Sequence, residues 1–87
     1  MNPDEFRRAG HEIVDWIADY LRDIERQTVV PDVQPGDIRR RLPSSPPLRS
    51  ESIDRLFADF RKLIVPAMTH WGHPGFFAYF PAMTSPP

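Results

Sequence analysis

The chain contains no cysteine and a single lysine, Lys62, among its 87 residues. Without cysteine it has no disulfide framework, no cysteine-ligated zinc and no thiol nucleophile, which fits a reducing compartment such as the cytoplasm. The net charge of −1 argues against a basic nucleic-acid-binding protein and against a highly charged disordered tail. No apolar run approaches the roughly 20 residues of a membrane-spanning helix, and we expect no signal peptide because the N-terminus is acidic and amphipathic. The composition predicts one domain at most, with neither a membrane nor a nucleic acid as partner.

Proline and charge are distributed unevenly along the chain. Proline accounts for 11 of the 87 residues, about two and a half times its usual share. Acidic residues are concentrated in 1–28 and prolines in the first half of 29–65, whereas 66–87 has no Asp, Glu, Lys or Arg but half of the aromatic residues. This division predicts a helix, a proline-rich connector with a second helix, and an uncharged aromatic tail.

An amphipathic helix is predicted from Pro3 to about Arg26. Asn2 is a favourable N-cap, Pro3 suits the first helical position, and Glu5 completes a capping-box-like pair. At 100° per residue the apolar side chains fall in one arc about 160° wide. These are Phe6, Ala9, Gly10, Ile13, Val14, Trp16, Ile17, Tyr20, Leu21 and Ile24. A surface helix usually needs an apolar stripe of about 100°. The second helix could cover the excess, but we favour contact with another chain or domain.

Residues 27–50 are predicted to form a mostly extended connector, because its five prolines prevent a long helix. One short helical turn is expected within 37–42. The run Arg39-Arg40-Arg41 could contact phosphate, but in a nearly neutral chain a solvated or interface-rim role is the better interpretation.

A second amphipathic helix is predicted at 51–65. Ser50 or Ser52 can cap it, and Pro66 disfavours helical geometry at Val65 and should end it. Lys62 lies among charged residues on the polar face. A Schiff-base lysine needs a desolvated site, so Lys62 is interpreted as a surface charge.

The aromatic tail, 66–87, should not be exposed in a stable monomer, because its uncharged aromatic cluster would favour aggregation. Its glycines and prolines predict a turn followed by an extended segment at 76–80. His70 and His73 could bind a metal, but zinc needs three or four ligands, so turn-stabilising hydrogen bonds are the favoured interpretation. We identify no metal site, and no catalytic residue is assigned because no nucleophile–base pattern, phosphate-binding glycine loop or carboxylate pair stands out.

Several short motifs together resemble one enzyme family. They are Asn2 with Glu5-Phe6-Arg7-Arg8, then Pro31-Asp32-Val33 with Pro35-Gly36, then Thr69-His70-Trp71, Pro74 and Phe76-Phe77-Ala78-Tyr79-Phe80-Pro81. In this order and spacing they are similar to the start of the group II pyridoxal-phosphate-dependent amino-acid decarboxylases, and most similar to the aromatic-L-amino-acid decarboxylases. The resemblance covers nearly all of the chain and about the first fifth of a family member.

The resemblance implies that the chain is the helical N-terminal segment of a fold-type I enzyme and is inactive alone. The catalytic domains, with the lysine that holds pyridoxal 5′-phosphate, would lie beyond residue 87, so this chain alone would bind no cofactor. In the family the first helices of two subunits run antiparallel in a homodimer. The implied dimer contacts are Phe6, Ile13, Trp16, Ile17, Tyr20, Leu21 and Ile24. The parent enzyme would remove CO2 from an aromatic or related L-amino acid, with the cofactor ring as electron sink.

The resemblance also implies a substrate-side wall formed by Tyr79, Phe80, Pro81 and Ala82. Relatives with a hydroxyl residue at position 82 use it as a substrate contact, and Ala82 lacks that hydrogen bond.

Taken without the resemblance, the fold class is all-α: helices at 3–26 and 51–65, the connector 27–50 and the tail 66–87.

Two other functions remain open. The chain could be a free-standing module that binds a helix of another protein on its first helix, and a stop codon after Pro87 would favour this alternative. It could also be an enzyme through His70, His73 or Lys62, the least favoured hypothesis.

Overall fold

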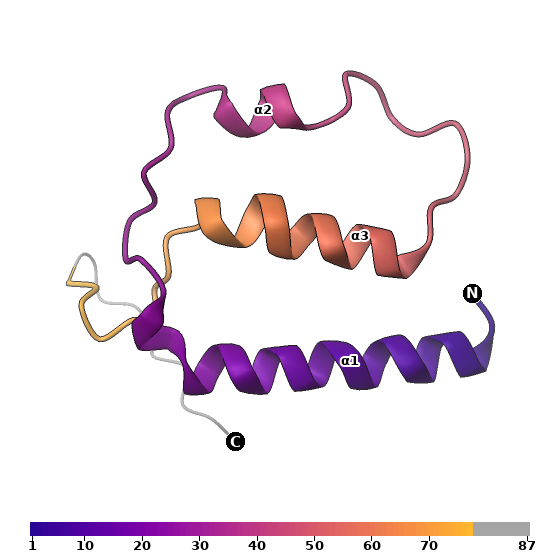
Figure 1. The fold of residues 1–87 in the computed structure, drawn as a ribbon, viewed down its shortest axis with the longest axis horizontal. Coiled ribbons are helices and arrows are strands. Elements are labelled where there is room, and N and C mark those ends of the chain that lie inside the picture. The colour runs from indigo at the N-terminus through magenta and orange to yellow at the C-terminus, as the bar shows by residue number, and fades with distance from the viewer. Residues whose placement is uncertain (78–87) are drawn as a thin grey trace. The chain divides into compact units, whose positions relative to one another are not determined.

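The computed structural model describes residues 1–77, and the chain divides into two compact units (Figure 1). The first unit contains Met1–Val29 together with the described residues from His70 onward. The second unit contains Val30–Thr69. All regular structure in the described residues is helical, which confirms the predicted all-α class.

The first unit is built on helix α1, Pro3–Arg22, which begins as the sequence predicts. The amide of Glu5 donates to Asn2 Oδ1 at 2.9 Å, and the amide of Asn2 donates to Glu5 Oε2 at 3.1 Å. This reciprocal capping box satisfies two of the amides that a helix start leaves without partners.

The end of α1 differs from the prediction of one helix reaching Arg26. The α-helix ends at Arg22, and a separate 3₁₀ turn, η1, covers Ile24–Arg26. Asp23 between them has φ −105° and ψ 20°, outside α-helical geometry. Aspartate is a poor helix interior residue, and the Asp23 carboxylate binds the neighbouring Arg22 guanidinium at 3.1 Å. A tightened 3₁₀ turn is a common way for a helix to end.

The first helix of the second unit is the short α2, Asp37–Arg41, where one helical turn was expected. Its N-cap, Gly36, has a φ of +90°, a conformation that glycine adopts without strain. The Asp37 carboxylate accepts from the amide of Gln34 at 2.8 Å and also binds Arg40. One arginine of the predicted solvated run is therefore paired within α2.

The predicted helix at 51–65 is divided into three helical types. Helix α3 covers Ile53–Asp59, the π-helical segment η2 covers Phe60–Ile64 and the 3₁₀ turn η3 covers Val65–Ala67. Ser52 is the N-cap, since its hydroxyl accepts from the amide of Arg55 at 3.2 Å.

The position of Pro66 also differs from the prediction. It lies in the first turn of η3 and does not stop the chain at Val65. Proline is accepted there because the first amides of a helical turn need no partner within the helix.

Few apolar side chains are buried in the described part of the chain. The buried ones are Ala9, Phe57 and Val65. Many large apolar side chains are instead exposed, with Phe77 at 90% and Leu48 fully exposed. None of the described helices combines the length and apolar character needed to cross a bilayer.

Candidate functional site

The apolar face of α1 divides lengthwise into two halves with different exposure. At 100° per residue, Ala9, Ile13, Trp16 and Tyr20 lie on one half, where Ala9 is buried and the other three are half-buried. Phe6, Val14 and Ile17 lie on the other half and are 70%, 62% and 44% exposed. Gly10 belongs to the exposed half and has no heavy atom within 4 Å of where its Cβ would be. We call Phe6, Gly10, Val14, Ile17 and Leu21 the open stripe.

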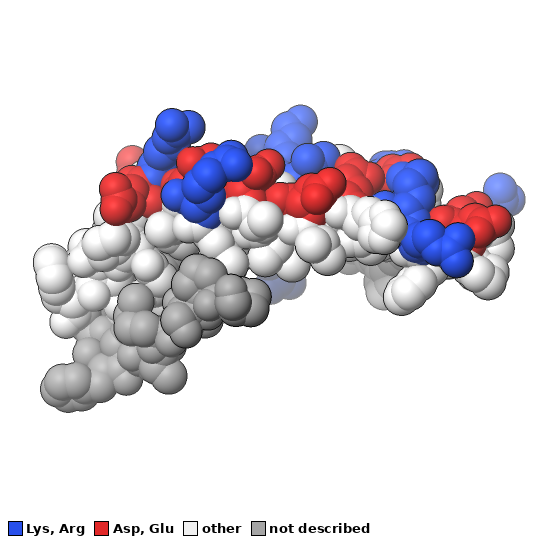
Figure 2. Space-filling view, turned by 90° about the horizontal axis from the view of Figure 1, so that it is seen from below, with Lys and Arg blue, Asp and Glu red and all other residues white. Residues whose placement is uncertain are grey.

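The predicted dimer contacts fall on both halves. Phe6 and Ile17 are exposed, whereas Ile13, Trp16, Tyr20, Leu21 and Ile24 are half-buried. Val14 was not among the predicted contacts, although its place in the apolar arc and its strong exposure qualify it equally. Figure 2 shows acidic and basic side chains interleaved along one band and an uncharged surface beside it.

The half-buried side of α1 carries an aromatic pair. The rings of Trp16 and Tyr20 stack with centroids 5.4 Å apart and 21° between their planes. Burial raises the pKa of the Tyr20 phenol.

The Tyr20 hydroxyl lies 2.7 Å from Nδ1 of His70, a residue 50 positions away in the sequence and 1% exposed. The amide of His70 donates to the carbonyl of Val29 at 3.1 Å. His73 Nε2 lies 3.2 Å from the carbonyl oxygen of Glu25. We call these three contacts the histidine clamp, because they tie the turn at 70–75 to α1 and to the residues that follow it.

Two hydrogen bonds determine the tautomer of His73. The amide of Gly75 donates to His73 Nδ1 at 2.8 Å, so Nδ1 carries no proton and Nε2–H donates to Glu25. A Cβ on Gly75 would lie 3.1 Å from His73 Nδ1 and 3.2 Å from Val29 Cγ2, tighter than ordinary contacts. Only glycine fits here without displacing a neighbour.

These contacts confirm that His70 and His73 make turn-stabilising hydrogen bonds. Within residues 1–77, no group of three or more histidine, aspartate or glutamate side chains is placed to hold a metal ion. The link to Tyr20 was not predicted. Its only signal in the sequence was a histidine in an uncharged aromatic segment.

The aromatic segment beyond the clamp is partly described. Trp71 and Phe76 stack with centroids 5.4 Å apart and 16° between their planes, while Trp71 is 52% exposed. The predicted substrate-side residues Tyr79, Phe80, Pro81 and Ala82 lie outside the described residues. The same is true of most of the predicted extended segment at 76–80.

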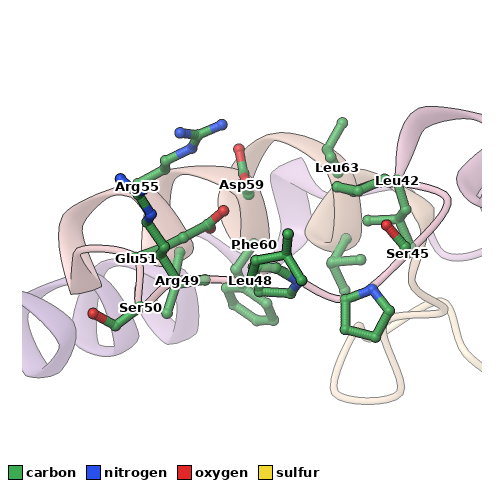
Figure 3. A pocket seen from close by; sticks show the side chains of 15 residues that line it. Leu42, Ser45, Leu48, Arg49, Ser50, Glu51, Arg55, Asp59, Phe60 and Leu63 are labelled. Carbon is green, nitrogen blue, oxygen red and sulfur yellow. The ribbon is translucent and has the colours of Figure 1, made fainter.

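The second unit contains an open groove of about 830 Å³ between the connector and the α3–η2 segment (Figure 3). Leu42 and Leu63 lie at one end, Phe60 and Leu48 in the middle, and the polar residues Arg49, Ser50 and Glu51 at the other end. Phe57 is buried, with its ring 6.4 Å from that of Phe60 and the Arg61 guanidinium 4.6 Å from its centroid.

The described part of the chain contains one lysine, and that lysine is not desolvated. The single lysine of the sequence, Lys62, is exposed on η2, as predicted for a surface charge. A lysine that forms a Schiff base needs a desolvated environment, which Lys62 lacks.

The comparisons with known proteins identify the family. Residues 35–87 match the pyridoxal-dependent decarboxylase conserved domain. The aromatic-L-amino-acid decarboxylase of Cavia porcellus is 48% identical over all 87 residues, which cover 18% of its length. The phenylacetaldehyde synthase of Petunia hybrida is 47% identical over 85 residues, 98% of this chain and 17% of that protein.

The crystal structure of Oryza sativa TDC with PLP superposes with a TM-score of 0.88 at 41% identity, covering 98% of this chain and 18% of that one. The chain belongs to the pyridoxal-dependent decarboxylase family, as its motifs indicated. It spans less than a fifth of the length of these relatives.

Proposed function

We propose that this chain is the N-terminal, dimer-forming segment of a pyridoxal-phosphate-dependent decarboxylase of aromatic L-amino acids, located in the cytoplasm. The observation that carries the proposal is the 48% identity to an aromatic-L-amino-acid decarboxylase over the full chain. The described residues include no desolvated lysine that could bind the cofactor. This agrees with a segment that lies outside the active-site centre of the enzyme.

The open stripe of α1 is the proposed dimer contact. It presents exposed Phe6, Val14 and Ile17, whose burial would contribute about 1.5–3 kcal/mol per side chain. Two copies related by a two-fold axis can bury the same stripe against itself. The predicted contacts Ile13, Trp16 and Tyr20, which lie on the other half of the apolar face, would then border this interface.

The remaining parts of the chain receive roles from the same proposal. Residues 27–50 would connect the dimer-forming helix to α3. Residues 66–87 would contribute one wall of the substrate-binding site, formed by Tyr79, Phe80, Pro81 and Ala82. Pyridoxal phosphate would be held by the catalytic domains.

The reaction product separates two activities within the family. Relatives named as a decarboxylase and as an aldehyde synthase are 48% and 47% identical to this chain. We propose amine formation, because an aromatic-L-amino-acid decarboxylase matches the whole chain.

The test is an assay of the full-length protein with pyridoxal phosphate and L-phenylalanine, L-tyrosine or L-tryptophan. We expect CO2 release with the corresponding amine. An aldehyde product would assign the synthase activity, and no CO2 release from any of the three would refute the proposal.

The alternative is a free-standing module that binds a helix of another protein. The exposed apolar side chains of the open stripe could contact a helix of another protein as well as a second copy of this chain. Sequencing the gene past the codon for Pro87 separates the two: an open frame of several hundred codons supports the enzyme, and an immediate stop codon supports the module.

A further inference from the structure

The histidine clamp joins two parts of the chain that have different roles in the proposed function, one in dimer formation and one in substrate binding. Tyr20 belongs to the helix that forms the dimer, and His70 opens the turn that leads into the aromatic segment. Their side chains meet at 2.7 Å although 50 positions separate them in the sequence. A contact of this kind couples the two tasks physically.

We propose that Tyr20 and His70 are positioning residues: their hydrogen bond fixes the start of the substrate-binding stretch to α1, so that substrate binding depends on this contact. The inference rests on the proposed function, which assigns Tyr79, Phe80, Pro81 and Ala82 to the substrate side. Tyr79 follows Phe77, the last described residue, by two positions.

The contacts around the clamp favour positioning over simple packing. His70 is 1% exposed, so its imidazole cannot exchange Tyr20 for water without opening the turn. His73 adds a second attachment through Glu25, and the amides of His73 and Phe76 donate to the carbonyls of His70 and His73 at 3.1 and 3.0 Å. The turn is therefore held at both histidines along its length.

The geometry at Gly75 indicates how closely the turn is seated. Its amide is held by His73, and its α-carbon approaches Val29 so closely that a Cβ would lie 3.2 Å from the valine methyl. Small displacements of the turn are resisted at Gly75 by packing against Val29 and at His70 by the Tyr20 hydrogen bond. A position fixed in this way can set the orientation of the residues that come next.

The test compares Tyr20→Phe with wild type in the full-length protein. The variant removes one hydroxyl and keeps the ring that stacks on Trp16. Ser52→Ala is the matched control, because it removes one hydroxyl hydrogen bond, the cap of α3, in the other unit. Both variants lose one hydrogen bond, but only Tyr20→Phe removes the contact with His70.

The first measurement is steady-state kinetics with L-phenylalanine, L-tyrosine and L-tryptophan. We expect Tyr20→Phe to raise KM about 2- to 10-fold, the range that loss of one hydrogen bond to a buried group gives, with kcat within about twofold of wild type. Ser52→Ala should leave KM unchanged. An unchanged KM in Tyr20→Phe, or an equal rise in both variants, overturns the inference.

The second measurement needs neither cofactor nor turnover. Hydrogen exchange of peptides spanning 70–77 should be about 2- to 10-fold faster in Tyr20→Phe than in wild type or Ser52→Ala. Equal exchange in all three proteins would show that the Tyr20–His70 hydrogen bond does not hold the turn, even if the enzyme is active. A wild-type protein without activity refutes the proposed function instead. The exchange rates then still test whether this hydrogen bond holds the turn.

Discussion

Two glycines illustrate how single positions determine stability in this chain. Gly36 caps α2 with a φ of +90°, and a Cβ there would lie 3.0 Å from Arg40 Nη1. Gly10 lies inside α1 in ordinary helical geometry, with open space around its Cβ position. The same substitution should therefore have opposite effects at the two positions.

We expect Gly36→Ala to lower the free energy of unfolding by about 1 kcal/mol or more, because alanine is strained at positive φ. Gly10→Ala should raise it by up to about 1 kcal/mol, because alanine favours the helix. Urea unfolding of both variants checks the prediction. Equal changes in the two would show that backbone conformation does not set these costs.

The Arg22–Asp23 pair makes stability depend on pH in the acid range. Hydrogen bonding to Arg22 lowers the pKa of the Asp23 carboxyl. Because the folded pKa is the lower one, this stabilisation is present above the unfolded pKa, about 3.9, and is lost as the pH falls through the folded pKa.

Thermal unfolding of wild type and Asp23→Asn between neutral pH and pH 2 measures this contribution. We expect the wild-type Tm to fall more steeply than that of Asp23→Asn below about pH 4. Parallel curves would mean that the ion pair adds nothing to stability, a result known for many exposed pairs.

The start of α1 depends on local sequence. Both hydrogen bonds of its capping box join Asn2 and Glu5, three positions apart. Asn2→Ala should cost about 1 kcal/mol of unfolding free energy, whereas Asn2→Ser should cost little because serine is an equally good cap. Chemical denaturation measures both, and equal losses in the two variants would contradict a capping role.

The helices also show what the sequence could and could not predict. The starts of α1 and α3 and the short α2 follow from caps, a glycine turn and apolar spacing, all of them local signals. The change to π-helical geometry at Phe60 and the 3₁₀ turn through Pro66 were not predicted, because no cap, turn or spacing signal in the sequence marks them. The Tyr20–His70 contact joins positions 50 apart, and a single sequence does not indicate which distant residues pair.

A charge in the open stripe of α1 should interfere with dimer formation. Ile17→Asp places a charge in the middle of the stripe, where burial against a second copy would be strongly unfavourable. We expect it to prevent the proposed dimer from forming while the helix content stays unchanged, because Ile17 is 44% exposed in the single chain. Circular dichroism and sedimentation velocity separate the two effects. Asp15→Asn, on the polar face, is the control and should change neither.

For the chain as a whole, the apolar surface exceeds what the described residues bury. Phe6, Val14, Leu48 and Phe77 are all more than 60% exposed, while the buried apolar residues are Ala9, Phe57 and Val65 in residues 1–77. Exposed apolar surface of this extent marks interaction sites in soluble proteins. The family assignment supplies candidates for the covering surface: a second subunit and the catalytic domains.

We propose that a second copy of the chain covers the open stripe of α1. The most direct measurement is the molar mass of the 87-residue chain by light scattering at tens of micromolar. We expect the mass of a dimer, twice the 10.1 kDa of one chain. A homogeneous monomer at that concentration would contradict the account.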